Sequence, residues 1–147
     1  MHDPISPALA RRPAEAAELV CLAISDGDLE AALAQYEHGA VLWPWAASAA
    51  SALGDRAVGD SAVGDSAVGE LAILMDLRLP LALRICTVVP GSGVALVLAE
   101  RHMRGTGPDG QPVRLSGSGA TVVRRRHDGT WRIAADAWCL VREGEPG

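Results

Sequence analysis

The sequence has no Lys and no Phe, a single Tyr and only three Cys among its 147 residues. Without Phe, the core has to be built from Leu, Val, Ile, Ala and the four Trp. Cys21, Cys86 and Cys139 lie far apart, which favours reduced core thiols over a disulfide framework. Because 49% of the residues are apolar, this length predicts one globular domain with a core of its own.

Several sequence features needed for other functions are also missing. No run reaches the ~18 apolar residues of a membrane helix, and the first residues lack a signal-peptide stretch. We therefore expect a cytoplasmic protein without a membrane partner. The net charge of −5 disfavours nucleic acid as a partner. No His-x-His, HExxH or Cys cluster suggests a metal, no glycine-rich phosphate loop is present, and no cofactor is expected.

The N-terminal third has helical spacing of its apolar residues. Pro13 can begin a helix because its missing N–H would be unpaired there. The periodicity predicts a first helix that ends near Gly27 and a second that starts after Asp28 and carries Tyr36 on its apolar stripe. A short strand over residues 40–43 should follow.

The C-terminal half reads as strands separated by turns. Gly-rich and Asp-Gly turn signals divide it into four segments, 79–88, 94–105, 113–126 and 131–141. Helices followed by an antiparallel meander predict an α+β fold, in which a curved, cone-shaped sheet and the N-terminal helices enclose a pocket.

The domain boundaries follow from the same patterns. Residues 1–12 should form a flexible arm, 13–142 a single domain and 143–147 a tail. A Gly-Asp-Ser-Ala-Val repeat interrupts the domain at about 54–69, and its five-residue period fits neither a helix nor a strand. The repeat is interpreted as an inserted loop, either inert at the surface or a lid over the pocket, before a short helix at about 70–75.

Two stretches resemble the nuclear transport factor 2-like superfamily, in its SnoaL-like and ketosteroid isomerase-like group. They are Ser25–Glu30 with Tyr36, and Gly105–Gly110 with Arg125–Ile133. The resemblance covers roughly residues 14–140. It implies the cone fold, a homodimer and a pocket for a hydrophobic small molecule.

The family's catalytic positions transfer only in part. Where ketosteroid isomerases have a general-base Asp, this chain has Trp43, and the oxyanion-hole positions fall near Val20 and Thr121. An Asp shared by SnoaL-like cyclases and limonene-type epoxide hydrolases matches Asp136. Arg101 matches the Arg of the hydrolases' Arg-x-Asp, but Met103 replaces its Asp.

Asp136 and Arg101 are therefore the candidate catalytic residues. A carboxylate in an apolar pocket could remove a proton next to a carbonyl, and the guanidinium would stabilise the oxyanion. The alternative is an ion pair that only joins two strands. The candidate pocket residues are Trp43, Trp138, Met103, Tyr36 and Thr121.

Three functions remain open on the sequence. The first is a cofactor-independent cyclase or isomerase acting on a hydrophobic, carbonyl-containing, polyketide-like molecule in bacterial specialised metabolism, such as antibiotic biosynthesis. The second is a non-catalytic binding or dimerisation module. The third is a limonene-type epoxide hydrolase, in which Asp76 or an Asp of the repeat replaces the missing carboxylate. Period two along the strand places His102 on the face opposite Arg101.

Overall fold

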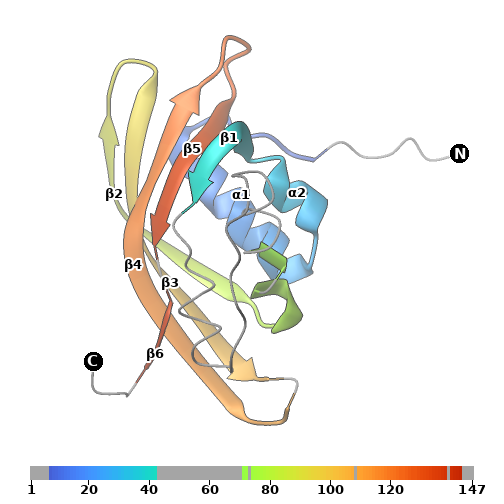
Figure 1. Cartoon of the computed structure of the whole chain (residues 1–147). Helices are drawn as coiled ribbons and strands as arrows, with labels where there is room; N and C mark the ends of the chain where they lie inside the picture. The colour runs from blue at the N-terminus through green and yellow to red at the C-terminus, as the bar shows by residue number, and fades with distance from the viewer. Residues whose placement is uncertain (1–6, 43–70, 73, 108, 139, 144–147) are drawn as a thin grey trace, which may run out of the picture.

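The computed structural model describes residues 7–42, 71–72, 74–107, 109–138 and 140–143. Its helices are α1 (Pro13–Asp26) and α2 (Leu29–Leu33). A further helical segment covers 71–72 and 74–76. Both named helices lie on the concave side of a curved sheet, as Figure 1 shows.

The sheet contains six strands, and their bounds follow the turn signals of the sequence closely. Its order is β1-β5-β4-β3-β2, with β6 beside β4. The strands β2 to β5 are antiparallel neighbours, as predicted, whereas β1 joins the edge parallel to β5. The strands are β1 (Tyr36–Leu42), β2 (Leu81–Pro90), β3 (Val94–Thr106), β4 (Pro112–Arg125), β5 (Trp131–Trp138) and β6 (Val141–Arg142).

The helix ends are set by local chemistry. Pro13 stands at the start of α1, and Gly27 ends it in the left-handed region at φ 71°, donating its N–H to the carbonyl oxygens of Ala23 and Ile24. The Asp28 carboxylate then accepts the N–H of Ala31 at 3.1 Å and caps α2. The helix has only five residues. Tyr36 therefore begins β1 and is not on a helix, which corrects the predicted position.

The core fills the space between α1 and the concave face of the sheet. Along β3, buried and less buried residues alternate with period two from Ala95 to Met103, as the sequence predicted. The alternation places Arg101 on the inner face. The largest fully buried apolar side chains are Leu71, Leu74, Met103, Leu115, Ile133, Leu140, Val97 and Val123.

An irregularity in β5 changes which residues face the core. Val122 pairs with Ala135, but the next residue of β4, Val123, pairs with Ile133, so Ala134 is an extra residue. Simple alternation would turn Asp136 outward if Ile133 faces inward. The extra residue shifts the alternation by one position, so Ile133 and Asp136 can face the same side. Both side chains are buried.

Gly119 allows β4 and β5 to approach closely beside this site. A Cβ atom at position 119 would collide with the Ala137 carbonyl and the Trp138 Cβ atom. The missing side chain leaves room for Trp138, which is 2% exposed.

Trp43, the repeat over 54–69 and Cys139 lie outside the described residues. The described end of the predicted arm is attached to the domain, because the Ala10 carbonyl accepts the Trp131 N–H at 2.9 Å. Gln35 also donates its side-chain amide to the Ala8 carbonyl at 2.7 Å.

Candidate functional site

Asp136 lies at the centre of a buried hydrogen-bond network. Its carboxylate is 2% exposed, and each oxygen accepts a bond from a different strand. The Tyr36 hydroxyl donates to Oδ2 at 2.9 Å, and the Thr121 hydroxyl donates to Oδ1 at 2.7 Å. A carboxylate can accept about four hydrogen bonds, so these contacts leave acceptor capacity for a ligand.

Arg101 brings a positive charge to the same site. Its Nη2 atom donates to Thr121 Oγ1 at 3.2 Å, so Thr121 links the guanidinium to Asp136. The guanidinium carbon lies 4.2 Å from the centre of the Trp138 ring, in a cation–π contact. Arg101 is 2% exposed, and its Nε and Nη1 atoms find no hydrogen-bond acceptor in the described part of the chain. A buried guanidinium with unused donors is suited to receive an oxygen atom from a ligand.

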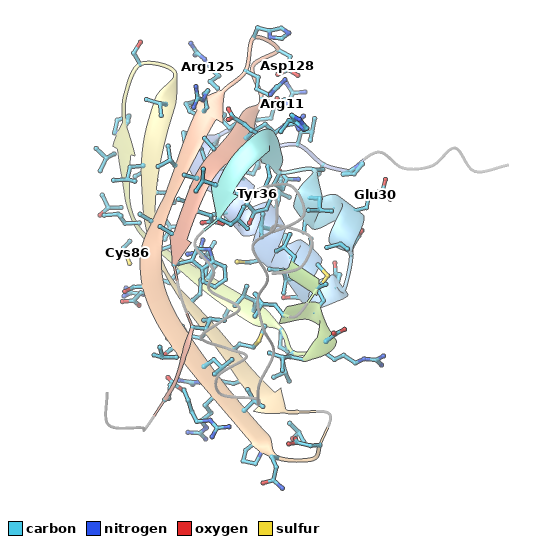
Figure 2. The ribbon with its side chains drawn as sticks, in the orientation of Figure 1. Arg11, Glu30, Tyr36, Cys86, Arg125 and Asp128 are labelled. Carbon is cyan, nitrogen blue, oxygen red and sulfur yellow. The ribbon has the colours of Figure 1, made fainter. Side chains whose placement is uncertain are left out.

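Tyr36 reaches this network from the sheet edge. β1 begins at Tyr36, which pairs with Ile133, while Leu42 pairs with Asp136. Figure 2 shows Tyr36 between the sheet and the helices. Its hydroxyl therefore joins the candidate site from an edge strand and not from a helix.

Burial and charge shift the acid–base properties of the network in identifiable ways. Burial raises the pKa of Asp136 above its usual value, while the Arg101 charge and hydrogen bonds from neighbouring side chains lower it. Burial and the neighbouring Asp136 charge raise the pKa of Tyr36 well above the ordinary range. Tyr36 is therefore a protonated donor near neutral pH, and Asp136 is a weaker acid than a surface carboxylate.

Cys21 is a neighbour of the site that the sequence did not single out. It lies on the buried face of α1, and burial raises the pKa of its thiol to about 11, against an opposing influence of Arg101. The sequence favoured a reduced core thiol at this position but carried no signal for its contact with β3. That contact depends on how α1 lies across the sheet.

The other predicted residues divide between the site and its surroundings. Met103 is fully buried on the inner face, where its thioether offers no substitute for the missing carboxylate. His102 lies on the outer face and lines a separate hollow of about 340 Å³ with Pro80, Ala82 and Arg104. Asp76 is exposed.

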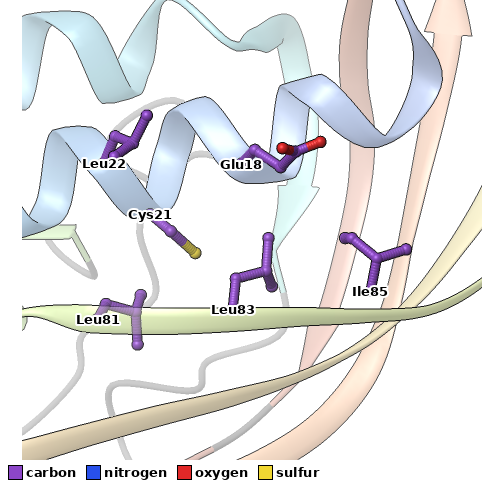
Figure 3. Close-up of a pocket in the computed structure, with 6 residues that line it drawn as sticks. All are labelled: Glu18, Cys21, Leu22, Leu81, Leu83 and Ile85. Atoms are coloured by element: carbon purple, nitrogen blue, oxygen red, sulfur yellow. The ribbon is translucent and has the colours of Figure 1, made fainter.

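A second hollow opens between α1 and β2, on the inner side of the sheet. It measures about 330 Å³, and Figure 3 shows its lining residues on α1 and β2. We call it the α1–β2 groove. Its lining consists of Glu18, Cys21, Leu22, Leu81, Leu83 and Ile85.

The described residues offer neither a cluster of metal ligands nor a membrane-spanning helix. They contain no group of three or more His, Cys, Asp or Glu side chains that could hold a metal ion. Among the same residues, no helix has the length and apolar character to cross a membrane.

The Tyr36→Phe variant should test the contact between β1 and Asp136. Removing the hydroxyl leaves one buried carboxylate oxygen without its donor, and we expect a loss of about 2 kcal/mol in the free energy of unfolding. The pKa of Asp136 should rise further, because the Tyr36 hydrogen bond lowers it. Urea unfolding at pH 7 and carboxyl-carbon NMR titration would measure the two effects. An unchanged pKa would show that the hydroxyl does not bind the carboxylate.

Comparison with solved structures identifies the class of fold. A ketosteroid isomerase-like protein from Erwinia carotovora atroseptica is similar, with 18% identity and a TM-score of 0.66. The match covers 90% of this chain and 95% of the Erwinia protein. A candidate calcium/calmodulin-dependent protein kinase II association domain from Xanthomonas campestris has 16% identity, a TM-score of 0.65 and 99% coverage of both chains. A candidate dehydratase of the nuclear transport factor 2-like family from Streptomyces avermitilis has 16% identity and a TM-score of 0.59. The match covers 87% of this chain and 92% of the dehydratase.

These similarities extend over nearly the whole chain, and they define an α+β cone with helices on the concave face of its sheet. The fold is that of the nuclear transport factor 2-like superfamily, which confirms the resemblance of the sequence at the level of the fold. No protein-family model matches the sequence, and no curated protein matches it significantly. At these identities the comparisons establish the fold alone, so function has to be argued from the site.

Proposed function

We propose that this protein is a cofactor-independent cyclase or isomerase that acts on a hydrophobic, carbonyl-containing, polyketide-like small molecule in bacterial specialised metabolism. One observation carries the proposal: a buried carboxylate, Asp136, shares a network with a buried guanidinium, Arg101, two of whose donor nitrogens have no acceptor among the described residues. Structural neighbours described as isomerase-like or as a candidate dehydratase support the same range of chemistry.

In the proposed mechanism, the Asp136 carboxylate removes a proton from the carbon next to the substrate carbonyl. The C–H electron pair forms the enolate, and Arg101 donates N–H groups to its oxygen. In isomerisation, Asp136 returns the proton to another carbon of the conjugated system. In cyclisation, the enolate carbon attacks a second carbonyl carbon of the same molecule, and the proton of Asp136 passes to the new alkoxide.

The network also fits the second function, a non-catalytic binding module. Tyr36 and Thr121 already occupy one acceptor position on each Asp136 oxygen, as they would in a purely structural cluster. A limonene-type epoxide hydrolase has less support, because Met103 is buried in place of a carboxylate and Asp76 is exposed. A homodimer and a cytoplasmic location remain part of the proposal.

Proton exchange tests enolate formation without knowledge of the natural substrate. The protein would be incubated with nonan-2-one in deuterated buffer, and deuterium at the carbons next to the carbonyl would be followed by NMR. We expect exchange well above the buffer rate. Binding of the ketone with exchange only at the buffer rate would contradict catalysis and support the binding module.

A further inference from the structure

The α1–β2 groove has the properties of a ligand site. Its volume of about 330 Å³ falls within the roughly 300–1,000 Å³ of small-molecule pockets. Four of its six lining residues are Leu or Ile. Leu22, on the α1 side, is 61% exposed and adds apolar surface at the mouth of the groove.

The inner wall of the groove adjoins Arg101. Leu83 lines the groove and is the direct cross-strand partner of Arg101. Side chains in such pairs have Cβ atoms about 5 Å apart. Cys21 lines the groove from α1 and is close enough to Arg101 for the guanidinium to influence its thiol. Leu83 and Cys21 therefore connect the wall of the groove with the surroundings of Arg101.

The charges between the groove and Arg101 favour a neutral ligand. Arg101 shares its network with Asp136, so the two charges offset one another at the inner end. Glu18 adds a carboxylate to the wall of the groove. The carboxylate of a fatty acid would be repelled by the Glu18 and Asp136 charges, whereas an uncharged ketone avoids this repulsion and can still accept hydrogen bonds from Arg101.

We infer that the α1–β2 groove admits a neutral, apolar ketone whose carbonyl passes Cys21 and accepts hydrogen bonds from Arg101, while its alkyl part lies against Leu81, Leu83 and Ile85. The inference rests on the proposed function for the identity of the carbonyl group. It adds the route of entry, the orientation of the ligand and the preference for a ketone over a carboxylate.

Titration with nonan-2-one and with nonanoate, followed by amide NMR, would test the site. The ketone should shift amide signals of residues 18–22 and 81–85, and nonanoate should bind at least about 10-fold more weakly. Cys21→Leu adds bulk at the inner end of the groove and should weaken ketone binding about 10-fold. Cys86→Leu is the matched control, because Cys86 is exposed on the other face of β2 (Figure 2), and it should leave binding unchanged.

Leu22→Glu provides a variant that does not disturb the core, because Leu22 is mostly exposed. It should weaken ketone binding while the unfolding midpoint stays near the wild-type value. Unchanged ketone affinity in both Cys21→Leu and Leu22→Glu, or nonanoate binding as tightly as the ketone, would overturn the inference. Loss of exchange in Asp136→Asn with binding unaffected by the groove variants would preserve the proposed function and reject only this route. Loss of binding in the groove variants, with exchange intact in Asp136→Asn, would reject the catalytic role and retain the ligand site.

Discussion

Asp136→Asn is expected to reduce the rate of ketone proton exchange by about 10²–10⁴-fold, the usual contribution of a positioned general base. The amide has nearly the same shape as the carboxylate and still accepts hydrogen bonds through its oxygen. It cannot hold the substrate proton at neutral pH. Exchange rates would be measured by NMR in deuterated buffer, and binding of nonan-2-one would be measured in parallel.

Asp76→Asn is the matched control for this prediction. Asp76 is exposed, and its replacement changes the net charge by the same amount. We expect exchange within about 2-fold of wild type, since surface substitutions away from a site have small effects. If Asp136→Asn retained the wild-type exchange rate, Asp136 would not be the base, and the carboxylate would have a structural role only.

Arg101→Leu should strongly destabilise the fold at neutral pH. The substitution leaves the Asp136 carboxylate buried without its nearby positive charge, and a buried charge left uncompensated in this way costs about 3–5 kcal/mol. It also removes the cation–π contact with Trp138. Denaturant unfolding at pH 7 would measure the loss.

The pH dependence of that loss follows from Asp136. Burial already raises its pKa in the folded state, and removing Arg101, which lowers the pKa, should raise it further. The raised pKa means that the folded state holds the proton more tightly than the unfolded chain does. This contribution is fully present below the unfolded pKa of about 3.9 and is lost as pH rises through the folded pKa. The difference in the free energy of unfolding between Arg101→Leu and the wild type should therefore become smaller as the pH is lowered.

A double variant separates charge from packing. Arg101→Leu with Asp136→Leu removes both buried charges, and it should recover a large part of the stability lost by Arg101→Leu alone. Exchange activity should stay absent. If the double variant were as unstable as the sum of the two single variants, the residues would not be energetically coupled.

The sequence predicted the elements well where local chemistry decides them. Pro13, Gly27 and the Asp28 cap define the helices, and the turn signals separated β2, β3, β4 and β5. Tyr36 was placed on the wrong element because apolar spacing continued past the end of α2. The parallel pairing of β1 with β5 is a contact between distant segments, which local patterns do not contain.

The candidate site was predicted in part. Period two along β3 correctly placed Arg101 and Met103 on one face, and the structure shows that this is the inner face. The burial of Asp136 depends on the extra residue in β5, and a bulge among small Ala residues has no distinctive sequence signal. The link from Arg101 through Thr121 to Asp136 joins three strands, so it required the register of the sheet.

The amino-acid sequence by itself determined the order of helices and strands, the apolar face of each element and the resemblance to a cone-shaped superfamily, because these depend on neighbours a few residues apart. Tertiary structure alone decided that Tyr36, Thr121 and Asp136 meet, that two Arg101 nitrogens have no acceptor among the described residues, and that Cys21 lines the groove near Arg101. Those contacts join residues up to 100 positions apart, as in the Tyr36–Asp136 bond, and only the packing of α1 and the registers of β1, β4 and β5 bring them together.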